Sequence, residues 1–158
     1  MKPASIATLK KELIHLPNDR LIEIILKVGK FKKENKEMLS YLLFDQEDEE
    51  AYQQGIKAYI DEQFEVINKE NYYFIKKSIR KILRNTKRYI KYSKNIETET
   101  SVLIHFCNKL YKLEPSYRRN NVLINLHQRQ IQLINKNIAN MHEDLRYDFQ
   151  QELIQFND

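Results

Sequence analysis

Apolar residues recur at intervals of three and four positions along almost the whole chain. This spacing places them on one face of a helix, whereas a half-buried strand would alternate apolar and polar residues. Pro17 and Gly29 mark two breaks: Pro17 disfavours helix in the residue before it, and Gly29 fits a C-terminal cap. The pattern predicts helices over residues 5–16, 18–28, 31–44, 45–67, 72–93, 98–113 and 117–156.

The last of these ranges would form a rod of about 60 Å if it were a single helix. We therefore expect a break near residues 140–144 that divides it into two antiparallel helices. The chain then has seven or eight helices joined by short connections. Its predicted fold class is all-α, with one domain over residues 1–158. Stacked antiparallel hairpins in a short superhelix are the expected architecture, and a compact helical bundle is the alternative.

The composition agrees with a folded helical protein, because 42% of the 158 residues are hydrophobic and only two are Gly and three Pro. A many-stranded fold would need more turn-forming residues than this. No apolar run reaches the roughly 18 residues of a membrane span. Cys107 is the single cysteine, so no internal disulfide can form. With no signal peptide visible at the start, these features predict a cytoplasmic protein without membrane insertion.

Charge is distributed unevenly along the chain, although the net formal charge is only +5. Residues 71–112 hold 11 basic and 2 acidic side chains, a net charge of +9. Residues 1–70 have a net charge of −3, and residues 113–158 a net charge of −1. Such an asymmetry indicates an anionic partner.

The predicted helix over residues 72–93 is the centre of this positive charge. A 100° rotation per residue places Ile75, Ile79 and Ile82 on one apolar stripe, and the rest of the circumference is cationic. Tyr73 projects into this cationic region. The candidate polyanion-binding residues are Lys76, Lys77, Arg80, Lys81, Arg84, Lys87, Arg88 and Lys91.

Three interpretations of this basic helix remain open. Its charges are solvated, or are neutralised by acidic residues elsewhere, such as residues 45–50 or the group Glu143, Asp144, Asp148 and Glu152. Alternatively, they bind the phosphates of a nucleic acid. The third interpretation is contact with an acidic protein or an anionic lipid. No helix-turn-helix or zinc-finger signature accompanies the helix.

The sequence offers no catalytic residues, cofactor site or metal site that we would assign. Glycine-rich phosphate loops are absent. Glu12 and His15 form a single E-x-x-H, whereas di-iron carboxylate proteins need two such motifs. Asp144, Asp148 and Glu152 lie at intervals of four, an arrangement that is usually solvated.

The stretches LPNDRLIEIILKV, NKEMLSYLLF, KKSIRKILRNTKRYIKYS and HEDLRYDFQQEL resemble an uncharacterised bacterial family of small all-helical proteins. That resemblance implies a free-standing helical domain. The family has no established activity, so it assigns no site residue.

The expected function is therefore that of a non-enzymatic helical scaffold or protein-interaction domain, with a protein partner or a second copy as the ligand. The alternative is a nucleic-acid-binding protein without sequence specificity, which uses the cationic face of helix 72–93. A hydrolase or metal enzyme built on Asp144, Asp148 and Glu152 is a distant third hypothesis.

Overall fold

The computed structural model of the protein describes residues 1–156. By their internal contacts, the residues separate into a first unit, Met1–Phe44, and a second unit that begins at Asp45. The single domain over residues 1–158 that the sequence analysis expected stays a prediction. The apolar side chains of the first unit are largely exposed.

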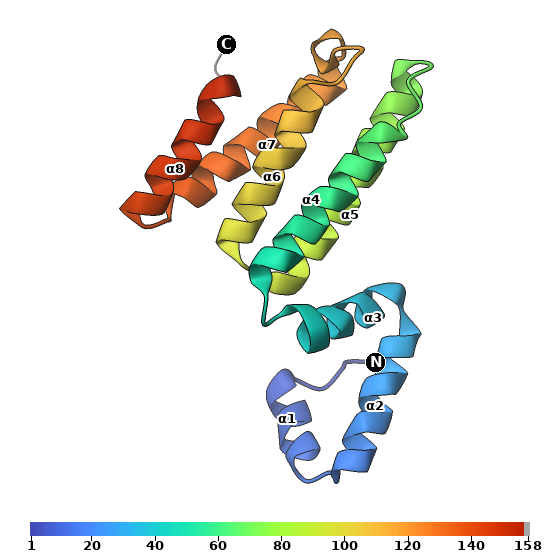
Figure 1. Cartoon of the computed structure of the whole chain (residues 1–158). Coiled ribbons are helices and arrows are strands. Elements are labelled where there is room, and N and C mark those ends of the chain that lie inside the picture. Colours follow the sequence, from blue (N-terminus) through green and yellow to red (C-terminus); the bar gives the residue numbers. More distant parts are fainter. Residues whose placement is uncertain (157–158) are drawn as a thin grey trace. The chain divides into compact units, whose positions relative to one another are not determined.

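The all-α prediction is confirmed, since residues 1–156 form eight α-helices and no strand (Figure 1). None of the helices in this described part of the chain is long and apolar enough to cross a membrane.

The first unit contains α1 (Ile6–Ile14), α2 (Asn18–Phe31) and α3 (Lys33–Ser40), followed by a π-helical turn, Tyr41–Asp45. Gly29 does not cap α2, as its sequence position suggested, because the helix continues to Phe31. A Cβ atom on Gly29 would lie 2.7 Å from Leu39 Cδ1, so this glycine lets α2 and α3 approach closely. The Asn35 side chain joins the same two helices by donating to the Val28 carbonyl at 2.8 Å.

The second unit contains α4 (Glu49–Glu65), α5 (Tyr72–Ser93), α6 (Ile96–Tyr111), α7 (Asn121–Ala139) and α8 (Glu143–Leu153). Side-chain caps start four of these helices, since each cap oxygen accepts a hydrogen bond from a backbone N–H that has no partner within the helix. The caps are Asp48, Asn71, Asn95 and Asn120.

Two helix boundaries test the predictions directly. The break expected near residues 140–144 is confirmed, because α7 ends at Ala139 and α8 begins at Glu143. Arg146 stabilises this corner by donating to the Met141 carbonyl at 3.2 Å. Thr98 or Thr100 was expected to cap the sixth helix, but Asn95 caps it instead.

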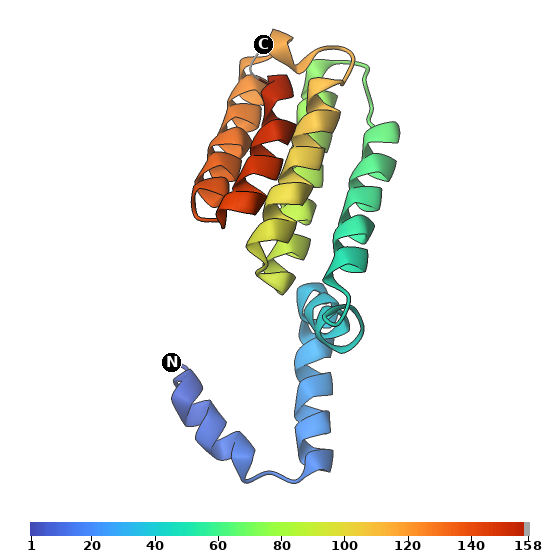
Figure 2. The ribbon, with the colours of Figure 1, turned by 60° about the vertical axis from the view of Figure 1, so that its left-hand side comes forward.

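The main hydrophobic core cluster consists of residues between Ile56 and Leu153 of the second unit and is centred on α6. This helix contacts α4, α5, α7 and α8, while consecutive helices run antiparallel (Figure 2). Leu103, Phe106 and Leu110 of α6 are completely buried, and the Phe106 ring packs edge to face against Phe64 of α4. Antiparallel neighbours thus share one core, and the outward side of α5 remains at the surface.

Candidate interaction surfaces

Helix α5 has one buried side, which fixes the orientation of the rest. Ile75, Ile79 and Ile82 are almost inaccessible to solvent. The Asn71 side chain caps the first turn, and Lys94 closes the last turn in a left-handed conformation with φ of 54°. The helix boundaries predicted from the sequence, residues 72–93, therefore match those of the structure.

The opposite side of α5 carries all eight candidate polyanion-binding residues, which we call the cationic face. Six of them are exposed, and Lys76 and Arg88 are half-buried. The cationic face consists of Lys76, Lys77, Arg80, Lys81, Arg84, Lys87, Arg88 and Lys91.

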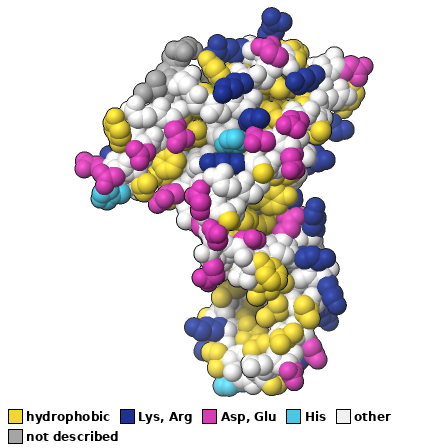
Figure 3. All heavy atoms as spheres, in the orientation of Figure 1, with side chains coloured by type: hydrophobic (Ala, Val, Ile, Leu, Met, Phe, Trp, Pro, Cys, Tyr) yellow, Lys and Arg dark blue, Asp and Glu magenta, His cyan; other side chains and the backbone are white. Residues whose placement is uncertain are grey.

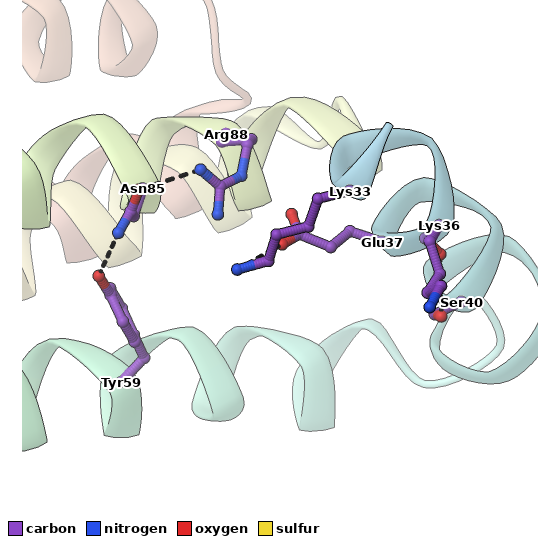
Figure 4. Close-up of polar contacts among 7 residues, drawn as sticks. All are labelled: Lys33, Lys36, Glu37, Ser40, Tyr59, Asn85 and Arg88. Atoms are coloured by element: carbon purple, nitrogen blue, oxygen red, sulfur yellow. Dashed lines mark hydrogen bonds and ion pairs between the residues drawn. The ribbon is translucent and has the colours of Figure 1, made fainter. Parts of the chain in front are cut away.

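Most of these cations have no carboxylate partner. Within residues 1–156, no ion pair involves Lys76, Lys77, Arg80, Lys81, Arg84, Lys87 or Lys91. Arg88 differs from them, because it donates to the Asn85 side chain at 3.0 Å and its guanidinium lies 5.2 Å from the Tyr89 ring centre. Asn85 in turn donates to the Tyr59 hydroxyl (Figure 4).

Three of the acidic residues that could have neutralised the cationic face make other contacts. Asp48 caps α4, and Glu49 accepts a hydrogen bond from the Thr98 hydroxyl at 2.7 Å. On α8, Asp144 lies 3.7 Å from His142. Glu99, by contrast, lies near the cationic face. It lines a hollow at the C-terminal end of α5 together with Lys87 and Lys91. Two hollows at the N-terminal half of α5 have no Asp or Glu in their lining.

Two surface hollows meet at Arg80. The first has a volume of about 490 Å³ and is lined by Tyr73, Lys76, Lys77, Arg80, Lys81 and Arg84. The second, of about 330 Å³, lies between α5 and α7, where Arg80 shares the lining with Asn125 and Arg129. Sequence reasoning missed Arg129, because no local pattern indicates that α7 lies beside α5.

The first unit presents a different kind of surface, made of exposed apolar side chains. Phe31 and Phe44 expose 77% and 79% of their area. Figure 3 shows hydrophobic side chains gathered in a hollow of this unit, with Lys and Arg side chains near its edges. We call the exposed apolar side chains of this unit, taken together, the apolar face. It consists of Ile6, Leu9, Leu13, Ile14, Ile22, Ile25, Leu26, Val28, Phe31, Met38, Leu42, Leu43 and Phe44. On α2 these side chains lie on more than one side of the helix, since Ile22 and Phe31 are nine residues apart.

Residues 1–44 hold nine basic and five acidic side chains, a net charge of +4. Few of these charges pair with one another: Arg20 binds Glu23 at 2.8 Å, and Lys33 lies 3.7 Å from Glu37 (Figure 4). The apolar face therefore lies in a basic surrounding.

A small group of ionisable residues joins α4 to α6. Asp61 accepts from His105 Nε2 at 2.7 Å and from Lys109 Nζ at 3.1 Å. Burial raises the pKa of Asp61, but the hydrogen bonds and positive charges of His105 and Lys109 outweigh burial and lower it below the ordinary 3.8. These contacts link α4 to α6 and thereby stabilise the packing of the two helices.

Two side chains of types that often take part in catalysis, Cys107 and His127, are buried. Burial raises the pKa of the Cys107 thiol to about 12, which leaves it protonated and unreactive. Burial and the positive charge of Arg118 lower the pKa of His127 below its ordinary 6.5. The His127 ring lies against the Tyr117 ring, with centroids 4.8 Å apart.

The carboxylates considered for metal binding are dispersed at the surface. Asp144, Asp148 and Glu152 are all exposed on α8, and Glu12 is exposed on α1. No group of three or more His, Cys, Asp or Glu side chains in the described residues could hold a metal ion.

Comparison with protein-family models, curated proteins and solved structures finds no match for this chain. The cationic face and the apolar face are therefore the features from which a function can be argued.

Proposed function

We propose that this protein is a non-enzymatic helical interaction protein that binds polyanions, nucleic-acid backbones in particular, through the cationic face. The observation that carries the proposal is the row of exposed cations on α5 without carboxylate partners. A surface helix ordinarily gains stability from oppositely charged side chains four residues apart, whereas like charges at that spacing are destabilising. A bound polyanion would supply the missing opposite charge.

The dimensions of α5 suit this role. Twenty-two residues form a rod of about 33 Å. Successive phosphates along one strand of a duplex are separated by roughly 3.4 Å along the helix axis, so the rod can follow several of them. Because the apolar side of α5 is held in the core, the cations are presented by a rigid element.

Fluorescence anisotropy with labelled duplex at several salt concentrations tests the proposal. With five or six phosphate contacts, we expect log Kd to change with log salt with a slope of magnitude about 4 to 6. The variant Arg80→Glu/Arg84→Glu should lose binding. Lys112→Glu/Lys136→Glu is the matched control, since it makes the same charge change at exposed positions outside the cationic face. Absence of binding at low salt, or equal loss in both variants, would contradict the proposal.

The apolar face supports a second candidate function, that of a protein-interaction domain. A folded protein that exposes many large apolar side chains in one unit offers contact surface for another molecule. We propose a second copy of the chain or a partner protein as its ligand, and the basic surrounding favours a partner helix with acidic flanks.

Sedimentation velocity over a range of concentrations separates these two ligands. A dimer that dissociates in Ile25→Asp/Phe31→Asp identifies a second copy. A monomer at all concentrations rules out a second copy, and the search then turns to an acidic partner helix. Loss of the folded second unit in this variant would show that the apolar face is instead needed for folding.

A cytoplasmic location, the absence of catalytic activity and membership of the uncharacterised bacterial family belong to the same proposal. The buried Cys107 thiol is consistent with a reducing compartment, since nothing in its surroundings activates it.

A further inference from the structure

Tyr73 is the one aromatic residue in the hollow that the N-terminal half of the cationic face forms. Its side chain exposes 65% of its area, although it lies on a helix that buries several other apolar residues. The ring contacts Phe74 edge to face, with centroids 5.3 Å apart and planes inclined by 78°. The contact with Phe74 leaves much of the Tyr73 ring open to solvent.

Tyr73 lies in line with three of the cations. Lys77, Arg80 and Arg84 follow it at spacings of four, three and four residues, which places all four side chains on one strip of α5. The distance along the helix axis from Tyr73 to Arg80 is about 10 Å. A polymer that alternates flat apolar groups with negative charges could contact both.

The second hollow extends this strip to another helix. Arg80 shares its lining with Arg129 and Asn125 of α7, so two arginines and an asparagine from different helices line one space. No ion pair within the described residues involves Arg80 or Arg129. Two arginines that line one hollow suit a phosphate, which a guanidinium group binds with two parallel hydrogen bonds.

From this arrangement we propose that the protein binds single-stranded nucleic acid, with a base stacked on Tyr73 and the adjoining phosphates held by Lys77, Arg80 and Arg129. The inference rests on the proposed polyanion function and specifies its ligand. In a duplex, the faces of the bases are covered by their neighbours, so Tyr73 would have nothing to stack on. In a single strand those faces are available, and stacking on an aromatic side chain tolerates any base.

The experiment compares a labelled single strand of about 12 nucleotides with the duplex of the same length, within the range of site sizes known for single strands. The wild-type protein should bind the single strand more tightly. Tyr73→Ala should weaken single-strand binding by about 5- to 140-fold, the effect of losing one stacked base, and should leave duplex binding nearly unchanged. Tyr73→Phe is the matched control, because it keeps the ring and removes the hydroxyl, and it should bind like wild type.

The salt dependence separates the two kinds of contact. Tyr73→Ala removes no charge, so the slope of log Kd against log salt should stay the same. Arg129→Ala should reduce its magnitude by about 0.7 for one lost phosphate contact to a single strand. A purely structural effect of either substitution would not produce this difference.

Each outcome has a distinct meaning. Equal affinity for single strand and duplex, with no effect of Tyr73→Ala, would overturn this inference and leave the polyanion function intact. Absence of binding to either form at low salt would overturn both. Circular dichroism of each variant confirms that it is folded, and the exposed position of Tyr73 makes a folding defect unexpected.

Discussion

The helices of the first and second units both carry large apolar side chains, but the two units bury these side chains to very different extents. Ile22 and Leu26 on α2 expose 55% and 52% of their area, whereas Leu103 and Leu110 on α6 expose none. The difference lies in the number of helices that meet. Helix α6 is contacted by four others, while α1, α2 and α3 have few neighbours to cover their apolar sides. An amphipathic pattern thus predicts a helix, but burial requires several such patterns to converge.

The same contrast gives the two units different capacities for binding. The second unit has a core, so it can hold the cationic face on a rigid helix. The first unit has exposed apolar side chains, which gain free energy when another surface covers them.

The largest contrast is expected from two phenylalanines. Phe106→Ala removes a completely buried ring that packs against Phe64, and should lower the free energy of unfolding by about 3–5 kcal/mol. Phe31→Ala removes a ring that is 77% exposed and should change the free energy of unfolding by less than about 0.5 kcal/mol. Urea denaturation followed by circular dichroism measures both values. Equal losses would show that Phe31 is buried in solution, in a dimer for example.

A smaller contrast is expected from two helix caps. The Asn95 side chain accepts from the backbone N–H groups of Glu97 and Thr98, so Asn95→Ala should cost about 1 kcal/mol. Ser5→Ala removes the cap of α1, which contains no buried residue. The same denaturation experiment should show almost no change for Ser5→Ala, because α1 contributes little to global unfolding. Hydrogen exchange of the α1 amides should nevertheless become faster.

The smallest effect is a pH dependence of stability that comes from His127. Because its pKa is lowered in the folded state, the unfolded chain binds the proton more tightly. The contribution of neutral His127 is fully present above pH 6.5 and is lost progressively as the pH falls below that value.

Urea midpoints measured on either side of pH 6.5 test this effect, with His127→Gln as the comparison. In this variant the urea midpoint should not fall as the pH decreases below 6.5. Asp61 does not interfere, since its lowered pKa places its own loss of stability at a more acidic pH, below about 3.8. A wild-type midpoint that is unchanged through this range would contradict the burial of His127.

Local sequence was sufficient to predict helix α5 and the break before α8. The run of cations opposite Ile75, Ile79 and Ile82 fixed both the length of α5 and its outward side. The break followed from the improbable length of a single helix over residues 117–156. Gly29 was misassigned, because local sequence cannot distinguish a helix cap from a site where Leu39 comes close.

Part of the candidate site could not be predicted from the sequence. Arg129 belongs to a helix that starts 28 residues after α5 ends, and no periodicity relates it to Arg80. Likewise, residues 45–50 were equally able to neutralise α5 or to serve at the start of α4. Their hydrogen bonds in the folded chain show the second role for Asp48 and a bond to Thr98 for Glu49.

The sequence by itself determined that this protein is helical, where its most basic helix lies and which side of that helix faces outward. These properties depend on spacing within one element, which 100° per residue converts into direction. The tertiary structure decided which apolar faces find a core, which cations stay without a carboxylate and which arginine of α7 joins Arg80. Those properties depend on contacts between residues far apart in the chain, and such contacts are set by the packing of α6 among its four neighbours.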